Sequence, residues 1–121
     1  MPHHQTHRQM SAEMRACIEA CTSCADECTK MIEHCLAMGG AHAEPPHIAT
    51  MLDCAEICRT SASFMLRNSS LHTETCGVCA VVCRTCEESC RALDGEEMKE
   101  CADECARCAE SCEKMARAAA T

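Results

Sequence analysis

The sequence predicts an all-α fold, an antiparallel up-down-up-down four-helix bundle with a cysteine-lined core. Three observations predict it. Cysteine and methionine recur at alternating steps of three and four residues, which is the spacing of one helix face. Three breaks, one with glycines and prolines, one with the run Arg-Asn-Ser-Ser and one with Gly95, divide the 121 residues into four segments of helical length. No stretch shows the two-residue alternation of a strand, and short connections favour antiparallel neighbours.

The first helix is expected over residues 7–38. Thr6 or Ser11 can cap its N-terminus, and the two glycines that follow residue 38 can end it. The second helix is expected over residues 46–68. A proline pair stands at its start, where proline suits the first helical turn, and the run Arg-Asn-Ser-Ser marks its end.

The third helix is expected over residues 71–94 and the fourth over residues 96–118. Gly95 is a good stop between them, and the fourth begins with acidic residues at the positive end of its helix dipole. The four helices form one expected domain, residues 10–118. Residues 1–9 are expected to be a disordered, histidine-bearing tail.

The residues that usually build a core are scarce. Ile, Leu, Val and Phe together number 13, and Trp and Tyr are absent. With a net charge of −8, such a composition normally indicates disorder. The sixteen cysteines and nine methionines change this, because a reduced buried cysteine is a small hydrophobe and methionine a pliable one. Sulfur-containing side chains therefore supply the expected core.

Every cysteine falls in register on one of four core-facing seams. They are Cys17, Cys21, Cys24, Cys28, Cys35, Cys54, Cys58, Cys76, Cys79, Cys83, Cys86, Cys90, Cys101, Cys105, Cys108 and Cys112. The other seam positions are Met10, Met14, Met31, Met38, His47, Met51, Ser61, Met65, His72, Leu93, Met98 and Met115. The sequence thus predicts a tube lined with thiols.

Thiols four residues apart on a helix have Cβ atoms about 5 to 6 Å apart, too far for a disulfide but suited to an inserted ion. Thiolates select Cu(I), zinc or iron–sulfur clusters. Zinc on all sixteen thiolates would leave a large negative charge in the core, whereas one Cu(I) per thiolate leaves none. Multiple Cu(I) ions are therefore the expected cargo. A zinc or general soft-metal buffer, and a structural protein with a thiol core, are the alternatives.

One end of the bundle should gather neutral donors around Cys35. Its members come from the end of the first helix, the start of the second and the turn between the third and fourth: His34, Met38, His47, Met51, Cys90 and Met98. Thioether and imidazole groups hold Cu(I) without adding charge. His34 and Met51 are the predicted ligands that admit copper there.

The span from about residue 10 to 118 resembles the bacterial copper storage proteins, on its cysteine-lined helices and the stretches DCAEICRTSASFMLRNS and CADECARCAESC. The resemblance implies a four-helix bundle whose sixteen inward cysteines bind many Cu(I) ions, a His/Met mouth for copper, and often a homotetramer. The sulfur seam is interrupted at Ser61 and Leu93. The chain is most similar to the cytosolic branch.

The remaining features exclude other classes. The N-terminus has no apolar export signal and no run reaches transmembrane length, so a cytoplasmic protein with no membrane contact is expected. The acidic balance disfavours nucleic acid as a partner.

No catalytic constellation appears, so storage and detoxification are expected rather than catalysis, with a copper chaperone or efflux system as partner. His3, His4 and His7 are expected to belong to the tail, with a Cu(II) site at His4 as the alternative.

Overall fold

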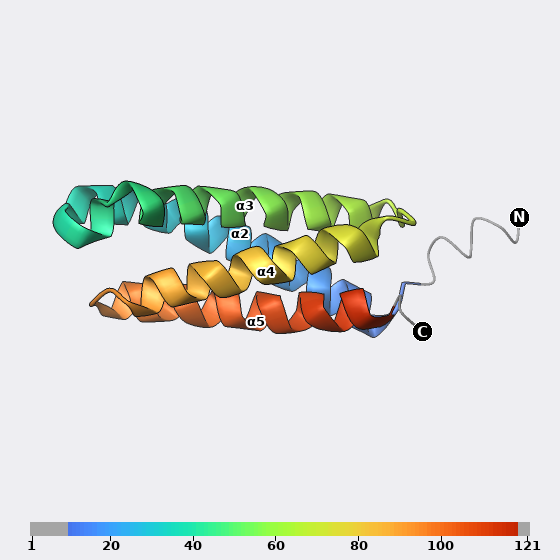
Figure 1. The fold of residues 1–121 in the computed structure, drawn as a ribbon. Coiled ribbons are helices and arrows are strands. Elements are labelled where there is room, and N and C mark those ends of the chain that lie inside the picture. Colours follow the sequence, from blue (N-terminus) through green and yellow to red (C-terminus); the bar gives the residue numbers. More distant parts are fainter. Residues whose placement is uncertain (1–9, 119–121) are drawn as a thin grey trace, which may run out of the picture.

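The structure, a computed structural model, describes residues 10–118. It consists of four long helices, α2 (Ala12–Met38), α3 (Pro45–Leu66), α4 (His72–Arg91) and α5 (Glu96–Ala118), with a short 3-10 helix η1 (Gly40–Ala43) after α2. The helices lie alongside one another and alternate in direction (Figure 1). α2 and α4 each pack against both α3 and α5, which closes the bundle. The predicted fold class is confirmed.

The first helix begins at Ala12 rather than at residue 7. Ser11 has extended backbone (φ −67°, ψ 158°), and its Oγ accepts a hydrogen bond from the backbone N–H of Met14 at 3.0 Å. Of the two predicted caps, Ser11 therefore serves this helix, because its hydroxyl satisfies an otherwise unpaired donor of the first turn. Thr6 and the predicted tail at 1–9 lie outside the described residues.

Two other helices end earlier than their sequence pattern indicates. α3 stops at Leu66 rather than 68, since Asn68 takes a left-handed conformation (φ 56°) that breaks the helix. α4 stops at Arg91 rather than 94, where Leu93 donates its N–H to the Cys90 carbonyl in a tight turn. Gly95 then reverses the chain at φ 116°, a value that side chains rarely permit.

Sulfur fills the core. All sixteen cysteines are completely buried, as are Met51, Met65 and Met98. Partly buried aliphatic residues flank them, including Ile32 and Val82. One seam methionine differs from its predicted inward position: Met38 is 58% exposed, because it is the last residue of α2 and extends beyond the packed part of the bundle. The close packing of these small side chains lets four helices enclose a narrow core.

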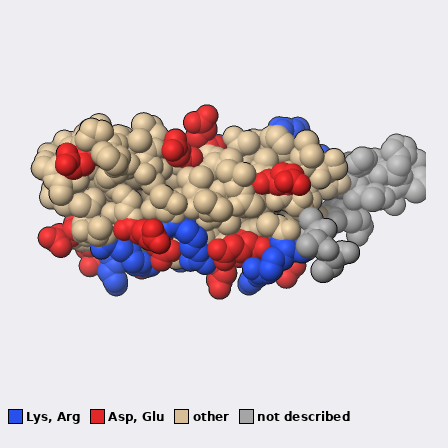
Figure 2. Space-filling view, in the orientation of Figure 1, with Lys and Arg blue, Asp and Glu red and all other residues tan. Residues whose placement is uncertain are grey.

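On the face shown in Figure 2, the charged side chains gather along α5 and the adjoining edge of α4, whereas the surface over α3 carries few of them. Arg84 bridges Glu113 of α5 at 3.0 Å, and Arg91 bridges Asp103 of α5 at 3.1 Å. Because these pairs are exposed, each contributes little to stability. Over residues 10–118, no helix combines the length and the hydropathy that crossing a membrane requires.

Candidate metal centre

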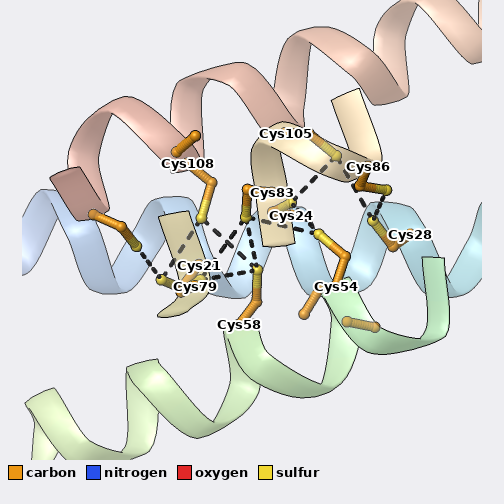
Figure 3. Close-up of a cluster of buried hydrophobic side chains, with 14 of the residues drawn as sticks. Cys21, Cys24, Cys28, Cys54, Cys58, Cys79, Cys83, Cys86, Cys105 and Cys108 are labelled. Carbon is orange, nitrogen blue, oxygen red and sulfur yellow. Dashed lines mark hydrogen bonds between the residues drawn. The ribbon is translucent and has the colours of Figure 1, made fainter. Parts of the chain in front are cut away.

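Sulfur atoms form a continuous file along the bundle axis (Figure 3). Each step in the file joins two Sγ atoms 3.6 to 4.0 Å apart. In order, the file runs through Cys17, Cys112, Cys21, Cys108, Cys58, Cys83, Cys54, Cys24, Cys105, Cys28 and Cys86. Cys79 branches from Cys58 at 3.6 Å. The thiols thus line a tube with no gap over most of its length.

The short sulfur contacts run between helices rather than along them. Among the thiol pairs four residues apart, Cys79 and Cys83 make such a contact, at 3.8 Å. Elsewhere the partner sulfur comes from a facing helix, as when Cys24 of α2 meets Cys54 of α3 at 3.8 Å. The closest sulfurs therefore offer donors from two helices to one ion, while pairs four residues apart such as Cys24 and Cys28 still belong to the same group of four thiols.

Three groups of four thiols and one of three have all their sulfurs within 4.8 Å of one another. The fourfold groups are Cys21, Cys79, Cys108 and Cys112; Cys24, Cys58, Cys83 and Cys108; and Cys24, Cys28, Cys54 and Cys105. The threefold group is Cys17, Cys76 and Cys112. Since Cys24 and Cys108 each belong to two fourfold groups, neighbouring groups share ligands. This arrangement suits a chain of bridged ions better than isolated sites.

All sixteen thiols are free, and they cannot all ionise together. The contacts of Cys105 with Cys101 and then Cys24 raise its pKa above the ordinary value, while the contact with Cys105 lowers the pKa of Cys24. One thiolate in the cluster therefore forms at the expense of its neighbours. A soft cation that replaces the protons removes this repulsion.

The end of the bundle where η1 connects α2 to α3, called the α2–α3 end below, carries a cluster of mixed donors. Cys35 Sγ lies 3.3 Å from His47 Nε2 and 3.7 Å from Met98 Sδ. Burial, followed by the negative potential of Cys101 and Cys86, raises the pKa of the Cys35 thiol to about 11. Burial lowers the pKa of His47, so its imidazole is neutral at pH 7. One imidazole, one thiol and one thioether thus meet at this end.

The two predicted non-cysteine ligands occupy different surroundings. Met51 is completely buried on α3, one turn after His47. His34 is half-buried, and its ring lies edge-on to His42 with centroids 6.3 Å apart. The contacts with Cys35 come instead from His47 and Met98. His47 and Met98 lie on the core-facing seams predicted from the sequence, and His34 does not. Their position on the seams could therefore have selected them over His34.

Near the opposite end of the bundle, one core-facing position carries the hydroxyl of a serine where its neighbours carry thiols. Ser61 is completely buried on α3, and its hydroxyl lies 3.4 Å from Cys76 Sγ and 3.3 Å from Thr75 Oγ1. The Cys76 thiol in turn donates to Met65 Sδ at 3.8 Å. The group at this end consequently has three thiols, and a hydroxyl and a thioether adjoin it.

Fold and site together define a class: a four-helix bundle that encloses a file of thiols, the donor set of a soft metal. The profile of the copper storage protein family matches residues 10–117. The chain belongs to this family. A cysteine-rich protein of Bacillus subtilis, YhjQ, is 34% identical over 81 residues, which are 67% of this chain and 75% of that protein.

Solved structures agree in fold. Nmul_A1745 of Nitrosospira multiformis is 48% identical, with a TM-score of 0.84 over 88% of this chain and 96% of that one. The Cu(I)-bound copper storage protein BsCsp3 of Bacillus subtilis is 34% identical, with a TM-score of 0.81 over 86% and 98%. Ccsp of Streptomyces lividans, loaded with 10 copper equivalents, is 29% identical, with a TM-score of 0.75 over 87% and 84%.

Proposed function

We propose that the protein stores Cu(I) in the cytosol, using all sixteen cysteines as ligands, and that it has no catalytic role. The observation that carries the proposal is the unbroken file of sulfurs 3.6 to 4.0 Å apart. A metal–sulfur bond of about 2.3 Å puts sulfurs about 3.8 Å apart around a tetrahedral ion and about 4.0 Å apart around a trigonal one. The thiols therefore stand at ligand spacing before metal binds. Family membership, and a related protein of Streptomyces lividans that is described as cytosolic, support the proposal.

Charge and geometry favour Cu(I) over zinc. Each Cu(I) that replaces a thiol proton leaves the core neutral, whereas a zinc tetrathiolate carries two negative charges. The fourfold groups also overlap at Cys24 and Cys108, so the two outer groups can be filled together but the middle one shares a ligand with each. A zinc buffer built on these groups would therefore saturate near two ions per chain.

Anaerobic titration with Cu(I) against a strong chelator tests the proposal. We expect cooperative uptake of more than about ten ions, approaching one per thiol, because neutrality is reached only then. Saturation near two, with equal uptake of zinc, would favour the soft-metal buffer. Absence of tight uptake would favour a purely structural thiol core.

Copper is proposed to enter and leave at the α2–α3 end. Cys35, His47 and Met98 can form a neutral site of thiolate, imidazole and thioether around one Cu(I). His34 and Met51, the two donors predicted from the sequence, lie close to this cluster along α2 and α3 and are proposed to receive copper before it reaches the file. A copper chaperone or efflux system would exchange metal there.

Replacing Ser61 by cysteine is expected to increase the Cu(I) capacity by about one ion per chain. The substitution exchanges a buried hydroxyl for a thiol beside Cys76, and so enlarges the threefold group at that end. The same titration measures the change. Ser61→Ala, which removes the hydroxyl without adding a ligand, is the control and should leave the capacity unchanged. A Ser61→Cys capacity equal to that of the control would contradict the expectation.

Self-association of the chain is also proposed. Leu52 of α3 and Val78 and Val81 of α4 are each more than half exposed, and the surface over α3 carries few charges (Figure 2). Apolar surface of this kind is typical of subunit contacts. The resemblance to copper storage proteins implies a homotetramer. Light scattering of the purified protein tests this, and a monomer mass would contradict it.

A further inference from the structure

We propose that Ser89 is a positioning residue for the copper site at the α2–α3 end. Its hydroxyl accepts the Nδ1–H of His47, which leaves the Nε2 lone pair directed at Cys35 and ready to bind Cu(I). This inference rests on the proposed function, since it concerns how one of the storage ligands is prepared.

The geometry places His47 between two partners on different helices. His47 Nδ1 lies 2.7 Å from Ser89 Oγ of α4, and its Nε2 lies 3.3 Å from Cys35 Sγ of α2. His47 is only 6% exposed, so water has little access to either nitrogen. Each nitrogen therefore depends on its protein partner for its hydrogen bond.

The chemistry of the two partners selects one tautomer. A neutral imidazole has one donor nitrogen and one acceptor nitrogen. The single Cys35 S–H proton has two possible acceptors, His47 Nε2 at 3.3 Å and Met98 Sδ at 3.7 Å. The imidazole nitrogen is nearer and a better acceptor than a thioether, so the best pairing has the S–H donating to Nε2. The proton of the ring must then be on Nδ1, where the Ser89 hydroxyl accepts it at 2.7 Å. The same Nε2 lone pair, freed when Cu(I) displaces the Cys35 proton, becomes a ligand beside Met98 Sδ.

Groups that hold the second ring nitrogen of a ligating histidine are known to change metal affinity by about 10- to 100-fold, because they fix both tautomer and ring orientation. Ser89 occupies this role for His47. It lies on α4, while the three proposed donors lie on α2, α3 and α5, so it contributes the fourth helix to the site.

The test compares Ser89→Ala and Ser89→Thr in the full-length protein. In the apo protein, ¹⁵N NMR of the His47 ring should show the Nδ1–H tautomer in the native chain and in Ser89→Thr, and a substantial Nε2–H population in Ser89→Ala. In Cu(I) titrations, about one ion per chain should bind Ser89→Ala about 10- to 100-fold more weakly than it binds the native chain, and the affinity for the remaining ions should be unchanged. Ser89→Thr, which keeps the hydroxyl, should bind this ion with the native affinity.

Ser111→Ala is the matched control, since Ser111 is equally half-buried on α5 and lies outside the His47 cluster. It should change neither readout. An Nε2–H tautomer in the native chain, or a Ser89→Ala protein with native tautomer and native titration, would overturn the inference. Failure of the native chain to take up Cu(I) would instead overturn the proposed function, and the apo tautomer would still be measurable.

Discussion

Replacing Cys24 and Cys108 together by serine is expected to damage copper storage more than any other pair of substitutions. Each thiol belongs to two of the three fourfold groups, so the double variant leaves no fourfold group intact. It also removes two interior members of the sulfur file and with them four of its steps. We expect the loss of at least about two Cu(I) ions, because each removed thiolate removes one compensating charge, and a loss of cooperative uptake. Anaerobic titration measures both quantities.

The control removes the same number of thiols from the ends of the tube. Cys17 belongs to the threefold group alone, and Cys90 belongs to none of the four groups. Their double serine variant should lose about two ions and keep cooperative uptake, since the fourfold groups survive. Both variants bury two new hydroxyl groups, so far-ultraviolet circular dichroism should first show equal helix content. Identical capacity and cooperativity in the two variants would rule out shared ligands.

Helical spacing accounts for how much of the fold could be predicted. A cysteine at every third or fourth position fixes the face on which it lies, and all sixteen are completely buried. Spacing does not fix the axial offset between helices, which depends on turns such as those at Gly39 and Gly95. The sulfur pairs across helices depend on that offset. For this reason the sequence predicted the thiol-lined tube but not which thiols meet in it.

The same limit explains why His34 rather than His47 was predicted as a ligand near Cys35. His34 precedes Cys35 in the chain, but adjacent residues of a helix point about 100° apart, so its ring turns toward η1 and His42. His47 is twelve residues from Cys35 and meets it from the facing helix at 3.3 Å. The end of α3 differs for a related reason: Asn68 breaks the helix through its left-handed backbone conformation, which residue type constrains only weakly.

Alkaline pH is expected to unfold the apo protein but not the copper-loaded one. Eleven of the sixteen thiols have a raised pKa and five a lowered one. Burial raises the pKa of the Cys35 thiol from 9.0 to about 11. A raised pKa means that the folded state holds the proton more tightly than the unfolded chain. The contribution of the Cys35 thiol to the stability of the folded state is therefore complete below pH 9.0 and is lost as the pH rises through about 11.

Circular dichroism during an alkaline titration measures the transition. The apo protein should keep its helix signal near neutral pH and lose it above pH 9.0, as thiols that ionise in the unfolded chain favour that chain. In the loaded protein Cu(I) has replaced the thiol protons, so the same rise in pH removes none from the core. Because the two forms have the same sequence, the loaded protein is the control. An apo protein that remains helical at about pH 12 would mean that the core tolerates many thiolates without metal, and the neutrality that selects Cu(I) would then lose its physical basis.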